Sequence, residues 1–391
     1  PPRSTLFPYT TLFRSGNSTF TGGLTLRAGA SLLIQGSNTL GAAGNALTID
    51  NGTLSIGTLA PTPLTIDASS NLTIAAGGAR FVAGGQSIVI ASQLTGSNPI
   101  QFGGGSFPGE EPKYDVRLTH AANTFVGSVR LGDAENSGST MLGLVADGSL
   151  GAVSNVVTLG SKFFDGESTR SAKGGLRAYA DLTLSASRTI QLDGGSNSYD
   201  DRGGVLDTNG HTITVAGSIS QLSSGMPLLK TGAGTLLLHG ANTFTGPTTV
   251  IEGTLGGTGS LAGSLELQNA ALLAPGASAG LFTVAGDLTL AATSTLLIEL
   301  GGTTRGSGYD ALNVGGTFLA DGTLSVSLIN GFNPVTGSTF ALVNATAFSG
   351  SFATLTLPEL AAGLSWDSSL LATAGTLSVT GSPIPEPGTY A

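Results

Sequence analysis

The sequence predicts an all-β protein in which short strands stack turn upon turn, as a β-solenoid. Apolar residues come in short alternating runs, such as Leu24 with Leu26 and Leu47 with Ile49, and not in long blocks. Glycine, with 61 copies, and Asn-Gly or Asp-Gly pairs close most of these runs. Helix-forming segments are almost absent. These observations favour strands and tight turns throughout the chain.

Most of the expected strands are pairs of large apolar residues around one small or polar residue, which gives one apolar face and one hydroxyl-rich face. They include Leu24/Leu26, Leu32/Ile34, Leu47/Ile49, Leu54/Ile56, Leu64/Ile66, Leu72/Ile74, Ile213/Val215, Leu236/Leu238, Leu265/Leu267, Leu288/Leu290 and Leu324/Val326. Such strands are too short to be stable alone, but stacking at roughly 4.8 Å makes a continuous core. The alternative is a sandwich of short hairpins. Closely spaced turns favour stacked turns of about 20–25 residues, with Asn and Gly at corners that need positive φ.

Composition limits the possible functions. Charged residues make up only 10% of the 391 residues, so hydroxyl and amide groups must keep the chain soluble. The formal net charge of −9 repels phosphate backbones, and we expect no nucleic-acid partner. Cysteine is absent, which excludes disulfides, thiolate zinc sites and a cysteine nucleophile.

Residues 1–15, PPRSTLFPYTTLFRS, differ in style from the rest of the chain. They resemble, codon for codon, the translation of a common short-read sequencing adapter, and the match stops at Ser15. From Gly16 the composition changes to Gly, Thr, Ser and Leu. We therefore expect 1–15 to be foreign to the natural protein, and the true N-terminus with any signal peptide to be missing. A genuine Pro- and Phe-rich arm is the alternative.

One short string returns along the chain, as expected for a repeat protein. Its copies are Ser18–Gly22, Asn123–Gly127 and Asn242–Gly246. Each copy has a phenylalanine at the same place, namely Phe20, Phe125 and Phe244. We expect these rings to stack in the core between turns. The irregular spacing of the copies indicates degenerate repeats with other turns between them.

The pattern divides the remaining chain into three parts. Residues 16–280 are predicted to form the solenoid of degenerate repeats. Longer strands and more aromatic residues from 281 onward predict a C-terminal β cap or small β-domain over 281–380. Residues 381–391 are read as a linker followed by a tail.

The clearest repeat is 229–255, LKTGAGTLLLHGANTFTGPTTVIEGTL. It closely resembles the autotransporter-associated β-strand repeat, a passenger-type repeat, at nearly every motif position. The resemblance implies a right-handed parallel β-helix and an extracellular protein. The turn at Ala274–Gly280 and the segment Tyr309–Val314 also look like parts of such proteins. The translocating domain of autotransporters has no counterpart in this sequence, so a passenger fragment is kept as an alternative.

The tail contains Pro385-Glu386-Pro387, which resembles the opening of a PEP-CTERM sorting signal. In that family an apolar helix and a basic cluster follow, and an exosortase-type membrane protease processes the signal. The sequence stops at Ala391, where the helix would begin. The resemblance implies processing by an exosortase-type protease, membrane contact only through the missing helix, and a place on the surface of, or outside, a Gram-negative-type bacterium.

No residue pattern predicts catalysis. The three histidines lie in unrelated segments, at His120, His211 and His239, and no Ser/His/Asp order is recognisable. We expect no enzyme activity and no cofactor.

One loop, 193–201, has carboxylates of the kind that bind Ca²⁺, which prefers oxygen ligands. The candidate ligands are Asp193, Asp200 and Asp201. The loop lacks EF-hand spacing and the repeated glycine-rich nonapeptide of calcium-binding β-helices. A solvated turn is therefore the preferred interpretation.

The sequence thus predicts an exported structural or adhesive β-solenoid, whose hydroxyl- and amide-rich face makes weak, multivalent contacts with extracellular polysaccharide or matrix. A polysaccharide-binding or polysaccharide-degrading β-helix is one alternative, and a calcium-dependent binder is another.

Overall fold

The computed structural model consists almost entirely of β-strands. It describes residues 4–6, 11–14, 21–34, 44–57, 60, 62–104, 114–133, 139–164, 169–194, 203–276 and 278–381. In this part of the chain most strand pairs are parallel, and antiparallel pairing occurs in two small sheets and at two isolated bridges. The predicted all-β parallel solenoid is confirmed. The chain forms two compact units, unit 1 (1–234 and 243–246) and unit 2 (235–242 and 247–391).

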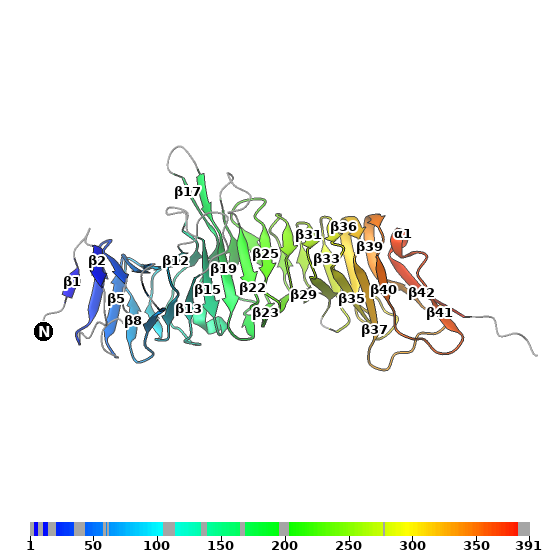
Figure 1. The fold of residues 1–391 in the computed structure, drawn as a ribbon, viewed down its shortest axis with the longest axis horizontal. Coiled ribbons are helices and arrows are strands. Elements are labelled where there is room, and N and C mark those ends of the chain that lie inside the picture. The colour runs from blue at the N-terminus through cyan, green and yellow to red at the C-terminus, as the bar shows by residue number, and fades with distance from the viewer. Residues whose placement is uncertain are drawn as a thin grey trace, which may run out of the picture. The chain divides into compact units, whose positions relative to one another are not determined.

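Unit 1 winds through three parallel sheets (Figure 1). The first sheet contains β1 (Ser4–Leu6), β3 (Leu24–Arg27), β5 (Ala46–Asp50), β8 (Asn71–Ile74) and β11 (Leu94–Gly96). The second contains β2 (Thr11–Arg14), β4 (Ser31–Ile34), β6 (Gly52–Ile56), β9 (Ala79–Ala83), β12 (Ile100–Gly104), β14 (Val129–Leu131), β16 (Val157–Leu159), β21 (Ile190–Leu192) and β24 (Ile219–Gln221). The third contains β7 (Leu64–Ile66), β10 (Ile88–Ile90), β13 (Asp115–Leu118), β15 (Thr140–Leu144), β19 (Gly174–Ala178), β22 (Gly204–Asp207) and β25 (Leu228–Thr231). Consecutive strands enter different sheets, and each pairs with a strand of the turn before, so the chain forms a parallel β-helix.

A further strand pair, a 3₁₀ turn and a hairpin belong to unit 1. The strands β20 (Leu182–Leu184) and β23 (Thr212–Val215) form a parallel pair. A 3₁₀ turn, η1, covers Asp147–Leu150. The strands β17 (Ser161–Phe164) and β18 (Thr169–Ala172) make an antiparallel hairpin that stands out from the stack in Figure 1.

The core of unit 1 is built from apolar columns that run across the strands. On the third sheet one register position holds Leu64, Ile88, Val116, Leu142, Leu176 and Leu206, each of them fully buried. Buried side chains alternate with more exposed ones along most strands, as the pleat requires. Phe125, predicted to lie in the core, is fully buried, and so is Phe244. Phe20 lies outside the described residues.

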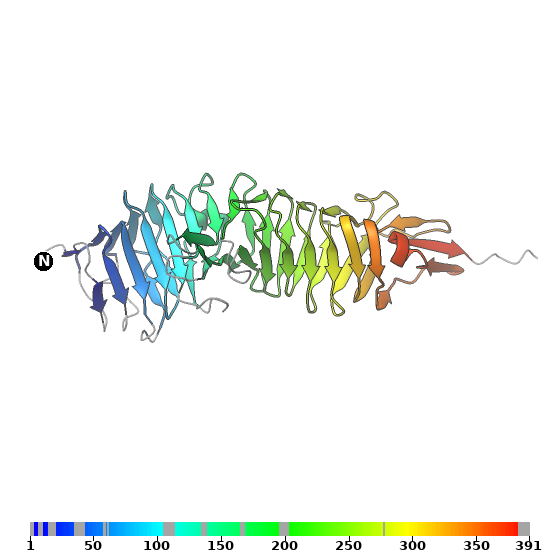
Figure 2. The same ribbon diagram turned by 90° about the horizontal axis from the view of Figure 1, so that it is seen from above.

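Unit 2 repeats this design in its own stack (Figure 2). One series of parallel strands is β26 (Thr235–Leu238), β29 (Thr254–Gly257), β32 (Leu272–Pro275), β35 (Thr295–Leu300), β37 (Thr323–Leu328) and β40 (Thr354–Thr356). Two further series are β27 (Ala241–Asn242), β30 (Ser260–Leu261) and β33 (Leu281–Val284), and β28 (Thr248–Val250), β31 (Leu265–Leu267) and β34 (Leu288–Leu290). The ten-residue strand β36 (Ala311–Ala320) pairs with both β33 and β34, and β39 (Val343–Gly350) pairs with β36.

Parallel pairing in unit 2 continues past residue 280, where the sequence predicted a change of pattern. The strands lengthen there, and an antiparallel sheet begins at Thr339, while β39 and β40 still pair in parallel with β36 and β37. This sheet consists of β38 (Thr339–Ala341), β42 (Thr376–Gly381) and β41 (Leu364–Asp367), with the short helix α1 (Leu371–Ala374) before β42. It holds Trp366, whose indole N–H donates to the Pro358 carbonyl at 2.8 Å. No helix within the described ranges has the length and apolar character needed to span a membrane.

The number of residues per turn varies more than the sequence suggested. Thr248 pairs with Leu265, 17 residues later, whereas Val157 pairs with Ile190, 33 residues later. Only the strands are held in register, so the loops between them can differ in length. The corners meet the predicted need for positive φ, since Asn51 has a φ of 55° and Asn209 a φ of 47°.

Buried asparagines bind the backbone at the corners of unit 1. Asn123 Nδ2 donates to the Ser149 carbonyl at 2.7 Å, and its Oδ1 accepts the Leu94 N–H at 2.8 Å. Asn155 accepts the Gly127 N–H and donates to the Phe125 carbonyl. Because corner peptides cannot pair within a sheet, these amides supply the missing partners.

Lys230 lies where the apolar column of the third sheet continues, in register with Leu206. Its side chain is fully buried. The ammonium group donates to the Thr208 hydroxyl at 2.9 Å and to the carbonyls of Thr231 at 3.0 Å and Gly232 at 2.5 Å. The buried lysine therefore supplies hydrogen-bond donors to the backbone carbonyls of a corner from inside the core.

We predict that Lys230→Met lowers the free energy of unfolding of unit 1 by about 1–3 kcal/mol, because two buried carbonyls and a hydroxyl lose their donor. Urea unfolding followed by far-UV circular dichroism measures the change. Lys162→Met is the matched control, because Lys162 is exposed and donates only to the Ser223 hydroxyl among described residues. Equal stability of Lys230→Met and the natural protein would contradict this role.

Candidate functional site

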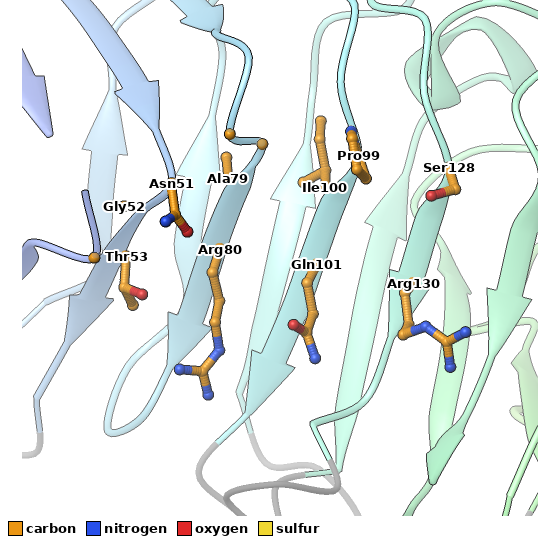
Figure 3. Close-up of a pocket in the computed structure, with 13 residues that line it drawn as sticks. Asn51, Gly52, Thr53, Ala79, Arg80, Pro99, Ile100, Gln101, Ser128 and Arg130 are labelled. Carbon is orange, nitrogen blue, oxygen red and sulfur yellow. The ribbon is translucent and has the colours of Figure 1, made fainter. Parts of the chain in front are cut away.

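One outward register position of the second sheet carries a polar side chain from β4 to β24. The residues of this polar row are Ser31, Thr53, Arg80, Gln101, Arg130, Thr158, Gln191 and Ser220. Their neighbours along each strand point into the core, so the row follows from strand alternation. Figure 3 shows four of these side chains, from Thr53 to Arg130, side by side on successive strands.

The middle of the polar row borders a shallow groove of about 340 Å³. The turn residues that precede the strands line its other side, among them Asn51, Pro99 and Ser128 (Figure 3). These residues are small, and Gly78 among them has a φ of +76°. A Cβ atom at Gly78 would lie 2.6 Å from the Pro99 carbonyl oxygen, so this corner accepts only glycine without a shift. The groove exists because the corners carry little side-chain bulk.

The two arginines of the groove are held by buried carboxylates. Arg80 pairs with Asp133, and Arg130 Nη1 donates to Asp193 Oδ2 at 2.8 Å. The side chains of Arg80 and Arg130 remain 27% and 40% exposed, whereas both carboxylates are nearly buried. Each pair balances one positive charge with one negative charge and anchors the guanidinium group. Between them, Gln101 Nε2 donates to the Gly132 carbonyl at 3.3 Å.

The structure places Asp193, a candidate calcium ligand, in this ion pair. Its Oδ1 accepts the N–H of Gly194 at 2.9 Å, so both carboxylate oxygens are engaged. Asp200 and Asp201 lie outside the described residues, as does the sorting motif Pro385-Glu386-Pro387. Within the described part of the chain, no group of three or more His, Cys, Asp or Glu side chains is arranged to hold a metal ion.

The histidines lie apart from the groove and form local contacts. His120 Nδ1 accepts the Ala122 N–H at 3.3 Å, and His211 Nδ1 lies 3.8 Å from the Asp181 carboxylate. His239 Nδ1 shares a hydrogen bond with the Thr258 hydroxyl at 3.0 Å. None of these contacts joins a nucleophile to a base and an orienting carboxylate.

A second polar cluster lies on the third sheet of unit 1. The Tyr179 hydroxyl donates to Asp115 at 2.6 Å and accepts from Arg117 Nη2 at 2.6 Å. The Arg117 guanidinium carbon lies 3.7 Å from the centre of the Tyr179 ring, a cation–π contact. Burial, followed by the bond to Asp115, raises the pKa of Tyr179, so the hydroxyl stays a donor. Gly143 makes room for the ring, since a Cβ atom there would lie 2.6 Å from it.

In unit 2 a buried carboxylate, that of Asp310, binds two backbone N–H groups. Asp310 Oδ1 accepts the Gly280 N–H at 2.8 Å, and Oδ2 accepts the Glu299 N–H at 2.9 Å. Burial raises the pKa of Asp310 to about 6, with a smaller contribution from the charge of Glu299, while the two backbone bonds act in the opposite direction. This carboxyl group therefore links two segments that are distant in sequence.

The described strands and their buried residues define a parallel β-solenoid. The sequence model of the passenger-associated-transport-repeat matches residues 10–30 and 228–256. The second match coincides with the predicted repeat at 229–255 and confirms it. The first includes residues 10–15, which resemble a translated adapter, and that interpretation stays a prediction. The chain matches no curated protein sequence at a significant level.

The second match contains the residues that hold the corners. The buried Lys230 ammonium group donates to the carbonyls of Thr231 and Gly232. Asn242 Nδ2 donates to the carbonyls of Gly240 at 3.1 Å and Ser260 at 2.9 Å. Phe244 is fully buried. Motif positions of the repeat are thus core and corner positions in the structure.

Sequence reasoning missed the groove and its arginines. Arg80, Gln101 and Arg130 are separated by irregular intervals, so no fixed period reveals that they share a register position. The available signal was weaker: each stands between two apolar residues in a short strand, as Arg80 does between Ala79 and Phe81.

We predict that Tyr179→Phe destabilises unit 1 by about 1–3 kcal/mol, because the buried Asp115 carboxylate loses a donor. A double-mutant cycle with Asp115→Asn, measured by urea unfolding, isolates the coupling between the two groups. A coupling energy of zero would contradict the interaction.

We predict that unit 2 loses stability as the pH rises from about 4 to about 6. A folded-state pKa of about 6, above the ordinary 3.8, means that the folded chain binds the Asp310 proton more tightly, so the stabilisation is full below pH 4. The loss is on the order of 2–3 kcal/mol. Fluorescence of Trp366, the single tryptophan, reports urea unfolding of this unit.

Asp310→Asn is expected to remove this pH dependence and to weaken unit 2 at acidic pH, because the Asn amide N–H₂ cannot accept the second backbone N–H. Asp367→Asn serves as control, since hydrogen bonds from Ser369 lower the pKa of the exposed Asp367 and its contribution has the opposite sign. An unchanged pH profile in Asp310→Asn would refute the assignment.

Proposed function

We propose that the protein is an exported bacterial surface or extracellular-matrix β-solenoid with a structural and adhesive role. The observation that carries the proposal is the passenger-type repeat at 228–256, whose Lys230, Asn242 and Phe244 are built into the stack. A repeat of this type is associated by its name with exported passengers. Sorting by an exosortase-type protease through Pro385-Glu386-Pro387 is part of the proposal and rests on the resemblance of that tripeptide.

The stacked design suits a structural role. Successive turns share continuous backbone hydrogen bonds, and apolar columns join each turn to the next. Such a stack presents one polar side chain of the row at each strand spacing of roughly 4.8 Å. Weak contacts made at several turns add up to firm attachment.

A non-catalytic role is supported by the state of the carboxylates near the polar surfaces. Asp133 and Asp193 beside the groove each pair with an arginine, and Asp115 binds Tyr179. A glycoside-cleaving site needs two carboxyl groups facing each other across a substrate, one of them available as an acid. Carboxylates held by cationic or hydroxyl partners are poorly placed for that chemistry.

Antibodies against the chain, applied to intact producing bacteria and to their fractions, test the proposed location. We predict surface labelling, loss of the antigen when intact cells are treated with protease, and recovery of the protein from the matrix or medium. Antigen found only in the cytoplasm would contradict export.

The sorting step has its own variant. Replacing Glu386 with alanine in the complete gene is expected to leave export intact but to block processing, so that the protein accumulates unprocessed in the membrane fraction. Glu359→Ala, the same change at a glutamate outside the motif, is the matched control. Normal processing of the Glu386→Ala protein would exclude the exosortase part of the proposal while leaving export untouched.

A further inference from the structure

We infer that the groove on the second sheet of unit 1 binds an extended, uncharged polysaccharide chain, which runs across the strands along the part of the polar row that lines the groove, from Thr53 to Arg130. This inference deepens the proposed surface role and rests on it, because it names the class of molecule that the adhesive face holds. The observations that carry it are the geometry of the groove and the charge balance of its side chains.

The polar row fits a linear ligand with a short repeat. Thr53, Arg80, Gln101 and Arg130 come from successive strands and form one line (Figure 3). Adjacent side chains are therefore separated by the strand spacing of roughly 4.8 Å. One pyranose unit of an extended polysaccharide has a similar length. Each successive sugar would thus meet the next polar side chain of the row.

The chemistry of the row fits hydroxyl groups. Guanidinium and amide groups are planar and present several hydrogen-bonding atoms, which match pairs of neighbouring sugar hydroxyls. Arg130 uses Nη1 for Asp193 and has further N–H groups on a side chain that is 40% exposed. Gln101 uses Nε2 for the Gly132 carbonyl, and its Oε1 accepts no hydrogen bond among the described residues. Donors and acceptors are thus present together.

The charge balance favours an uncharged ligand over an acidic one. Both groove arginines are neutralised by carboxylates that are nearly buried, at Asp133 and Asp193. The whole chain carries a net charge of −9, which opposes the approach of a polyanion. A ligand that uses hydrogen bonds and not charge is the better partner for this surface.

The test compares uncharged polysaccharides with an acidic polysaccharide and with an extended polypeptide. Affinity electrophoresis of the full chain in gels containing hydroxyethyl cellulose, glucomannan or xylan measures retardation by uncharged chains. Carboxymethyl cellulose presents the same backbone as hydroxyethyl cellulose with negative charge added. Unfolded casein represents an extended polypeptide. We expect retardation by at least one uncharged polysaccharide, little by carboxymethyl cellulose and none by casein.

Two variants locate the binding in the groove. Ser128→Trp fills the groove from an exposed turn and is expected to abolish retardation. Gln101→Ala removes the hydrogen bonds of one side chain to the ligand and is expected to weaken binding about tenfold. A tenfold change corresponds to about 1.4 kcal/mol of binding free energy. Gln191→Ala is the matched control, because Gln191 occupies the same row on β21 but does not line the groove. Its binding is expected to equal that of the natural chain. Circular dichroism confirms that each variant is folded.

Several outcomes would overturn the inference. They are no retardation by any uncharged polysaccharide, stronger binding of carboxymethyl cellulose or casein, or binding that survives Ser128→Trp and Gln101→Ala. These outcomes are separable from failure of the proposed function. If the protein lies on the cell surface but binds no polysaccharide, only the inference about the groove is refuted. If it stays in the cytoplasm but binds hydroxyethyl cellulose, only the proposed export is refuted.

Discussion

In-register stacking is the constraint on which the rest of this structure depends. Each turn must bring the chain back so that its apolar side chains stack on those of the turn before. The corners between strands then leave backbone N–H and C=O groups without a partner in a sheet. The molecule meets the requirement with buried polar side chains. Asn123 and Asn155 bind corner peptides in unit 1, Lys230 does so from inside an apolar column, and Asp310 does so in unit 2. Removing water from these corners makes each hydrogen bond costly to lose.

The same constraint explains how regular strands coexist with irregular turns. A turn can take 17 or 33 residues because pairing fixes only the strand positions, such as Thr248 on Leu265 or Val157 on Ile190. The loop between strands is free to lengthen, as in the hairpin of β17 and β18, without disturbing the column beneath it. A repeat motif can therefore be clear at 228–256 and degenerate elsewhere while the fold continues.

The sequence predicted the features that depend on local pattern. Alternating pairs such as Leu236 and Leu238 became strands with buried apolar faces, and Phe244 became a core residue. Features that depend on contacts between turns could not be predicted. A lysine in a polar motif is expected in solvent, yet Lys230 is buried, because it lies in register with Leu206 of the turn before and also binds the Thr208 hydroxyl of that turn. Asp193 looked like part of a solvated loop, but Arg130, which holds it, precedes it by 63 residues.

Core and surface positions alternate along each strand, and this separates the fold from what the surface can do. A change at Leu206 or Lys230 alters packing in the next turn, since both belong to a continuous column. A change at Gln101 or Gln191 alters the outward face and leaves the apolar column in place. The polar row can thus vary from strand to strand while the stack remains intact. In a chain with only 10% charged residues, arginine enters this row together with a buried carboxylate, so the face it presents is one of hydrogen bonds and not of net charge.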